Sequence, residues 1–155
     1  MKQRYNPSFL LILLFSAFLI SSCGEEGGDG GGTPTPEPED PLDAQAALLN
    51  GNWSVKDANS VSKDGTIVDV FTTMTLSFSG GTKSGGNYST SHNEPSGTEV
   101  WPTSGSWTFQ NGDKNKLLRS DGVSVSISVT ETTLRTSFTV SGGVKDGNWV
   151  FDFVK

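Results

Sequence analysis

Polar and apolar residues alternate along most of the chain after residue 50, most regularly in its second half. Three runs place their large apolar residues on one face of an extended chain: Val123–Val129, Leu134–Val140 and Trp149–Phe153. A period of two residues fits a strand with one buried and one solvent-facing side, which is typical of antiparallel sheets. The pattern therefore predicts an antiparallel, all-β domain.

Short turn signals separate these runs and connect them to earlier ones. Asp121-Gly122 lies between two alternating runs, and Asn111-Gly112 precedes one of them; both dipeptides favour tight hairpin turns. Further strands are predicted at Trp53–Asn59, Ile67–Phe71, Met74–Ser79, Tyr88–Ser91, Ser106–Gln110 and Lys116–Ser120. About eight strands joined by sequential hairpins close most simply into an up-and-down β-barrel.

One short helix is expected just before the first strand. Asp40 can act as its N-cap, Pro41 suits the first helical position, and Ala44–Leu49 can continue it. Asn50-Gly51 can end it. No later segment shows a convincing helical period, so the folded domain is predicted to be a barrel over residues 42–155, opened by this helix.

The first 22 residues show the three parts of a secretory signal peptide. Lys2 and Arg4 make the start positive, Phe9–Ile20 is apolar, and Ser21-Ser22 supplies small residues before a cleavage site. The apolar stretch has about 12 residues, whereas a helix that spans a bilayer needs ~20. We therefore expect a signal peptide over residues 1–22, not a permanent transmembrane helix.

The residues that end this signal, Ile20-Ser21-Ser22-Cys23, resemble the lipobox of bacterial lipoproteins. The resemblance implies that the Cys23 thiol is acylated, that the chain is cut before it, and that the protein is anchored to the outer membrane. Cys23 is the only cysteine in the chain. No internal disulfide can form, so the domain must be held by its core.

Residues 23–41 form a predicted tether between this anchor and the domain. The segment is rich in Gly and Pro and cannot bury enough apolar surface to fold, so we expect a disordered spacer of roughly 20–25 Å. It carries six acidic residues and no basic ones. An acidic stretch after a lipidated cysteine resembles the surface-export signal of Bacteroidota lipoproteins, which implies exposure at the cell surface; a solvated spacer is the alternative.

The predicted domain shares one short motif with a known family. Gly51-Asn52-Trp53 follows the predicted helix and opens the first strand. This arrangement resembles the Gly-x-Trp motif of lipocalins, in which the tryptophan packs over one end of the barrel. A late arginine stacks on that tryptophan in the family, and Arg135 is the candidate here. Stretches similar to the lipocalin-like domains of Bacteroidota lipoproteins are Trp101–Phe109, Ser120–Val123 and Thr132–Leu134.

Charge and residue types argue against several function classes. Apart from the signal and the tether, the chain carries nine basic and eleven acidic residues without a basic stripe, so nucleic acid is not an expected partner. His92 is the only histidine, and no Gly-x-Ser-x-Gly motif accompanies it, so we expect neither an enzyme nor a cofactor. His92, Glu94 and Glu99 could approach a metal ion, but a solvated loop explains them better and no metal is expected.

Binding of a small hydrophobic ligand, in or at the mouth of the barrel, is the function that the lipocalin resemblance favours. Tyr88 and Trp101 are predicted to lie near the mouth, and the other contact residues are predicted to line the interior. The predicted set is Tyr88, Trp101, Phe78, Phe109, Ile127 and Phe138.

Two alternatives rest on residues 80–105, a segment rich in Gly, Ser, Thr and Asn that is predicted to contain one short strand and the longest loop. The first alternative is a structural or interaction module with a filled core, which presents this loop to an envelope protein. The second is glycan binding on Trp101 and Tyr88, which requires both rings to be exposed and roughly coplanar. Trp101, just before Pro102, is either a ligand platform or a lid packed on the core.

Overall fold

The computed structural model describes residues 39–155. The predicted signal peptide (residues 1–22), Cys23 and nearly all of the predicted tether lie outside the described residues. Within residues 39–155, no helix has the length and apolar character needed to cross a membrane.

The predicted helix is present as α1 (Pro41–Leu49). The Asp40 carboxylate accepts a hydrogen bond from the Leu42 N–H at 2.9 Å, which caps the first turn. At the other end, the Asn50 N–H donates to the Ala46 carbonyl at 3.1 Å. Gly51 follows with a φ of 128°, which favours glycine and lets the chain turn directly into the first strand.

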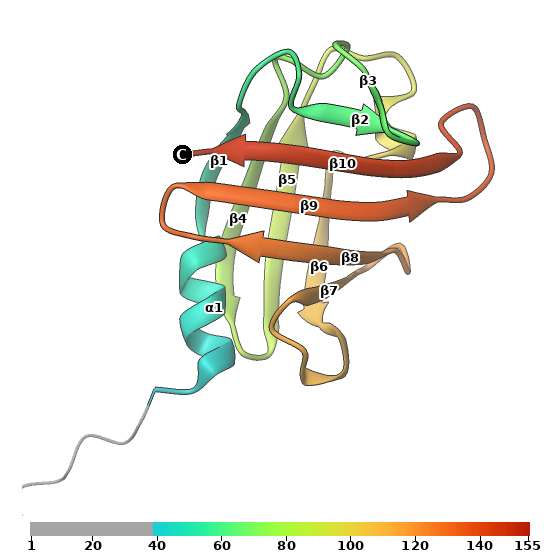
Figure 1. Cartoon of the computed structure of the whole chain (residues 1–155). Helices are drawn as coiled ribbons and strands as arrows, with labels where there is room; N and C mark the ends of the chain where they lie inside the picture. Colours follow the sequence, from blue (N-terminus) through green and yellow to red (C-terminus); the bar gives the residue numbers. More distant parts are fainter. Residues whose placement is uncertain (1–38) are drawn as a thin grey trace, which may run out of the picture. The chain divides into compact units, whose positions relative to one another are not determined.

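Eight antiparallel strands form a closed barrel, as the alternating pattern predicted (Figure 1). Each of the eight barrel strands pairs with the next barrel strand along the chain, starting with β1 and β4, and β1 and β10 close the barrel through Ser54 opposite Val154. The fold class is therefore confirmed. The barrel strands are β1 (Gly51–Val55), β4 (Thr75–Thr82), β5 (Gly85–Ser91), β6 (Ser104–Phe109), β7 (Lys116–Arg119), β8 (Ser124–Val129), β9 (Thr133–Val140) and β10 (Gly147–Val154).

A small hairpin, β2 (Val61–Lys63) and β3 (Thr66–Ile67), extends the sheet beside the first half of β10. The predicted strand at Ile67–Phe71 is wrong, because β3 ends at Ile67 and the chain then crosses the end of the barrel. Phe71 is fully buried there, with its ring centroid 5.4 Å from that of Phe151. Burial under the barrel end, and not in a strand, explains the apolar character of this segment.

Residues 80–105 are also more regular than predicted. They contain the end of β4, all of β5 and the start of β6. Apart from the two-residue turn between β4 and β5 at residues 83–84, only residues 92–103 lie outside the strands, and they include the 3₁₀ turn η1 (Gly97–Glu99). The longest connection is therefore much shorter than the predicted loop.

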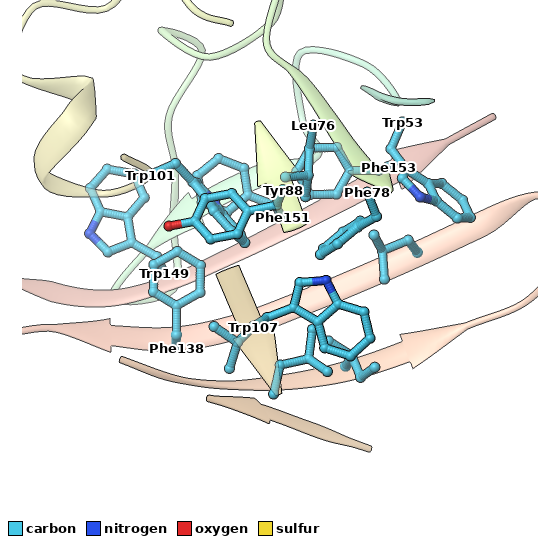
Figure 2. Packing of buried hydrophobic residues seen from close by; sticks show 14 of the residues in the cluster. Trp53, Leu76, Phe78, Tyr88, Trp101, Trp107, Phe138, Trp149, Phe151 and Phe153 are labelled. Atoms are coloured by element: carbon cyan, nitrogen blue, oxygen red, sulfur yellow. The ribbon is translucent and has the colours of Figure 1, made fainter. Parts of the chain in front are cut away.

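Aromatic side chains fill the interior of the barrel (Figure 2). Trp149, Phe151 and Phe153 project from alternate positions of β10, and neighbouring rings lie 5.9 Å and 5.7 Å apart in stacked arrangements. An eight-stranded barrel is just wide enough for side chains to fill it. The aromatic content of the strands is thus explained by packing.

The end of the barrel beside α1 is sealed by Trp53. Its indole N–H donates to the Leu49 carbonyl at 2.8 Å. The Lys155 ammonium lies 4.4 Å from the Trp53 ring centroid and donates to the Leu48 carbonyl at 2.9 Å. The prediction that Arg135 stacks on Trp53 is wrong, because Arg135 pairs with Asp152 on the outer surface.

Candidate functional site

The opposite end of the barrel, here called the mouth, has no α-helix over it within residues 39–155. Two irregular connections cover it: residues 68–74, which bring in Phe71, and residues 92–103, here called the plug segment. Figure 2 shows Trp53 and Trp101 at opposite sides of the buried cluster. The two ends of the barrel are therefore closed by different means.

Polar contacts at its edges hold the plug segment in place. The Thr90 hydroxyl donates to the Pro102 carbonyl at 3.0 Å. Glu94 forms a partly buried ion pair with Lys145 in the connection between β9 and β10. The Glu99 carboxylate accepts the N–H groups of Val144 and Lys145 at 3.0 and 3.2 Å. The bonds of Glu99 are exposed, whereas the Thr90–Pro102 bond and the Glu94–Lys145 pair are partly buried.

Trp101 is the central side chain of the plug segment and is only 1% exposed. Its ring meets those of Tyr88, Phe138 and Phe151 edge to face, at centroid distances of 5.8, 5.1 and 6.4 Å. The guanidinium carbon of Arg119 lies 4.7 Å from the centroid of the indole. Such contacts stabilise a ring beyond its buried area. The Trp101 side chain thus fills the mouth and packs on the core.

Arg119, the last residue of β7, is a charged residue inside the barrel and is 3% exposed. Its Nη1 donates to the Val100 carbonyl at 2.9 Å, and its Nε donates to the Asp121 carboxylate at 3.1 Å. Nη2 forms an ion pair with the other carboxylate oxygen. A buried cation requires a partner of this kind. The Asp121-Gly122 turn between β7 and β8 supplies it.

Burial and the Arg119–Asp121 pair shift the titration of two groups at the mouth. Burial of the Asp121 carboxylate favours its neutral form, but the hydrogen bonds and charge of Arg119 outweigh this effect and lower the pKa of Asp121. Burial raises the pKa of the Tyr88 hydroxyl; Arg119 opposes the shift and Asp121 adds to it. The Tyr88 hydroxyl is buried without a hydrogen-bond partner, and so is the indole N–H of Trp101.

The predicted ligand-binding residues are all buried, with exposures between 1% and 8%. The structure brings three of them together at the mouth: Tyr88, Trp101 and Phe138. Phe78 and Phe109 instead pack around Trp107, at 6.1 and 5.1 Å.

Ile127, the sixth residue of that set, is buried on β8. The exposed, roughly coplanar pair of rings that glycan binding on Tyr88 and Trp101 requires is not present: both side chains are buried and their ring planes meet at 74°.

Three shallow hollows lie on the outer face of β8, β9 and β10, with volumes of about 290, 150 and 290 Å³. Serine side chains such as Ser126 and Ser137 line two of them, and Arg135 lines two. The predicted mouth residues Tyr88 and Trp101 line none of the three. These hollows belong to the polar surface of the sheet.

The residues considered for a metal site have other roles. Glu94 and Glu99 bind the connection between β9 and β10. The His92 ring lies against Phe71, with centroids 5.8 Å apart, and its two nitrogens are buried without hydrogen-bond partners. Within residues 39–155, no three His, Cys, Asp or Glu side chains gather closely enough to hold a metal ion.

Arg119 was missed at the sequence level, although a signal for it exists. Arg119 lies two positions after Leu117 on the predicted strand Lys116–Ser120, so the two side chains share the inward face of the strand. A charged residue on the inward face of a strand, two positions before an Asp-Gly turn, could have indicated a buried ion pair.

Comparison of the chain with protein-family models, curated proteins and solved structures found no match.

Proposed function

We propose that the chain is a lipid-anchored, non-enzymatic lipocalin-like protein that binds a small apolar ligand at the mouth of its barrel. The ligand takes the space that the Trp101 side chain occupies in the structure. Acylation of Cys23 holds the protein in the outer membrane, and the acidic tether is consistent with exposure at the cell surface. The barrel fold supports the binding proposal, and the lipobox resemblance supports the anchor.

The observation that carries this proposal is the difference between the two ends of the barrel. Trp53 is sealed under a helix and the last residue of the chain. Trp101 sits on an irregular segment whose edges are held by a few exposed or partly buried hydrogen bonds and one ion pair. Departure of the plug segment would break one hydrogen bond of the strand ladder, from the Thr90 N–H to the Thr103 carbonyl at 2.8 Å, and would leave the register pairs of the eight barrel strands in place.

The burial of Trp101 sets an upper limit on how often the mouth is open. An aromatic side chain buries ~150–250 Å², which at ~25 cal/mol per Å² makes its exposure cost about 4–6 kcal/mol. Since opening also breaks the buried hydrogen bond from Arg119 to the Val100 carbonyl, the open form makes up at most roughly one molecule in 10³ to 10⁴, and the apparent affinity for a ligand falls by at least the same factor. Removing the indole should therefore strengthen ligand binding.

A neutral apolar dye, N-phenyl-1-naphthylamine, tests this expectation because its fluorescence rises in apolar surroundings. The barrel, α1 and the core all lie within residues 39–155, so the chain from Gly24 onward, which lacks the thiol, is suitable. Trp101→Ala should bind the dye at least about a hundredfold more tightly than wild type, since the competing side chain is gone. Trp53→Ala removes the same side chain from the sealed end and is the matched control.

Equal binding by the two variants, or no binding by a folded Trp101→Ala protein, would contradict the proposal. If Trp101→Ala does not fold, Trp101→Leu keeps most of the packing and should still bind more tightly than Trp53→Leu. For the anchor, wild-type protein made in a bacterial host should incorporate labelled fatty acid and Cys23→Ser should not; equal labelling would exclude acylation at this position.

A second candidate is a filled-core interaction module, favoured by the packed interior and by the hollows on the outer face of β8–β10. It predicts that wild-type and Trp101→Ala proteins both fail to bind the dye. It also predicts that, in the chain from Gly24 onward, Ser126→Arg with Ser137→Arg, which fills the two hollows that these serines line, abolishes association with the envelope fraction without lowering thermal stability. Unchanged association would remove this candidate.

A further inference from the structure

The plug segment presents two chemical groups to Arg119, and both come from adjacent residues. The Val100 carbonyl accepts the hydrogen bond from Nη1 at 2.9 Å. The Trp101 ring lies over the guanidinium, with its centroid 4.7 Å from the central carbon. An acceptor oxygen and a flat aromatic ring are therefore bound together at one buried cation.

When the plug segment leaves the mouth, Arg119 loses one hydrogen-bond acceptor and one aromatic neighbour. Nη1 loses its only acceptor among the described residues, and one face of the guanidinium loses its aromatic neighbour. Nε and Nη2 keep their bonds to Asp121. A buried donor without an acceptor is costly, so a ligand that supplies an oxygen there is favoured over one that does not.

The oxygen that fits this position is uncharged. Asp121 already neutralises Arg119, and its lowered pKa keeps it ionised at neutral pH. A ligand carboxylate would bring a second negative charge to a pair that is already balanced, in a site with little water. The native acceptor is itself a neutral carbonyl.

The walls of the site select the shape of the ligand. Tyr88, Phe138 and Phe151 turn their ring edges or faces toward the Trp101 ring at nearly perpendicular angles, between 74° and 81°. These arrangements favour a flat ring over an alkyl chain of equal area. The Tyr88 hydroxyl, buried without a partner, provides one further donor beside the ring.

We propose that the ligand of this site is a planar aromatic molecule, about the size of two fused rings, that carries an uncharged acceptor oxygen such as an amide or ketone. The ring replaces Trp101 on Arg119, and the oxygen replaces the Val100 carbonyl. This inference rests on the proposed function, since it names the class of ligand for the same mouth.

Displacement of N-phenyl-1-naphthylamine from the wild-type chain by four small molecules tests the inference. N-acetyl-L-tryptophanamide has both the ring and the neutral oxygen, indole has only the ring, N-hexylacetamide has only the oxygen, and indole-3-acetate has the ring with an anion. The first should compete about tenfold more strongly than each of the others, because it alone meets both requirements of Arg119.

Arg119→Met should remove the advantage of N-acetyl-L-tryptophanamide over indole, while Arg135→Met, which alters an exposed arginine on the outer face, should preserve it. Circular dichroism shows whether Arg119→Met is folded; if it is not, Arg119→Lys should reduce the advantage, because an ammonium group cannot stack and donate as the guanidinium does.

The possible outcomes separate the two proposals. If the dye binds and all four molecules displace it equally, the ligand class is wrong although the mouth binds apolar molecules. If indole-3-acetate competes best, the ligand is an anion and the neutral oxygen is wrong. If the dye binds neither wild type nor Trp101→Ala, the proposed function fails, and the inference fails with it.

Discussion

The buried ion pair at the mouth predicts an unusual asymmetry between the effects of its two partners on stability. Arg119 has 2% of its side chain exposed, whereas Asp121 has 34%. Asp121→Asn preserves shape but leaves the buried guanidinium without a counter-charge, and breaking a buried pair in this way typically costs ~3–5 kcal/mol. Because Asp121 is partly exposed, water can reach the guanidinium and reduce the cost of the missing counter-charge. We therefore expect the free energy of unfolding to fall by about 2–4 kcal/mol.

Arg119→Met should cost less, although it removes the larger side chain. Methionine fills much of the same volume between Trp101 and Phe138, and Asp121 can then turn to water. The main loss is the hydrogen bond to the Val100 carbonyl, worth about 1–2 kcal/mol. The double variant, Arg119→Met with Asp121→Asn, should be no less stable than Arg119→Met alone, because neither protein contains the buried Arg119 charge.

Urea unfolding of the wild type, both single variants and the double variant measures these differences in one cycle. Asp152→Asn, which removes the partner of the exposed Arg135, is the matched control and should cost less than about 1 kcal/mol. An Arg119→Met protein that is less stable than Asp121→Asn would refute the account of Arg119 as a buried cation held by one carboxylate.

Three further predictions concern the same cluster. The lowered pKa of Asp121 means that its stabilisation is complete above the unfolded value, about 3.9, and is lost as pH falls through the lower folded-state value; the stability difference between wild type and Asp121→Asn should therefore shrink toward pH 2 in urea unfolding. Tyr88 is the only tyrosine after Tyr5, so an absorbance titration of the chain from Gly24 onward should show one phenol ionising above the ordinary value of about 10, because burial raises its pKa; a midpoint at or below that value would contradict its burial. Gly105→Ala would place a methyl group 2.6 Å from the Tyr88 hydroxyl and 2.7 Å from the Ser120 hydroxyl, so thermal and urea unfolding should show a loss of about 1–3 kcal/mol; a neutral substitution would mean that the cluster is loosely packed.

The architecture of the barrel was largely predictable because its causes are local. A two-residue period, Asp-Gly turns and an Asp-Pro helix start each act over a few residues, and β8, β9 and β10 follow the predicted runs closely. The β2 strand was missed because Val61–Lys63 is short and only its first residue is buried. Phe71 was placed in a strand because apolar content alone does not distinguish a strand from a segment that covers the end of a barrel.

The site was harder to predict because its contacts join distant parts of the chain. Trp101 was recognised as either a platform or a lid, and deciding between them required Phe138 and Phe151, which follow much later. Arg119 was overlooked because charged residues on strands usually face water. Lys155 takes the position expected of Arg135, since the end of β10 brings it beside α1.

Fluorine NMR of the chain labelled with 5-fluorotryptophan tests the central claim most directly, because each of the four tryptophans gives its own signal. With N-acetyl-L-tryptophanamide present, the signal assigned to Trp101 through the Trp101→Phe variant should become sensitive to solvent, as expected for an indole that has left the mouth. The signals of Trp53, Trp107 and Trp149 should remain those of buried rings. Binding of the ligand while the Trp101 signal stays buried would contradict the account.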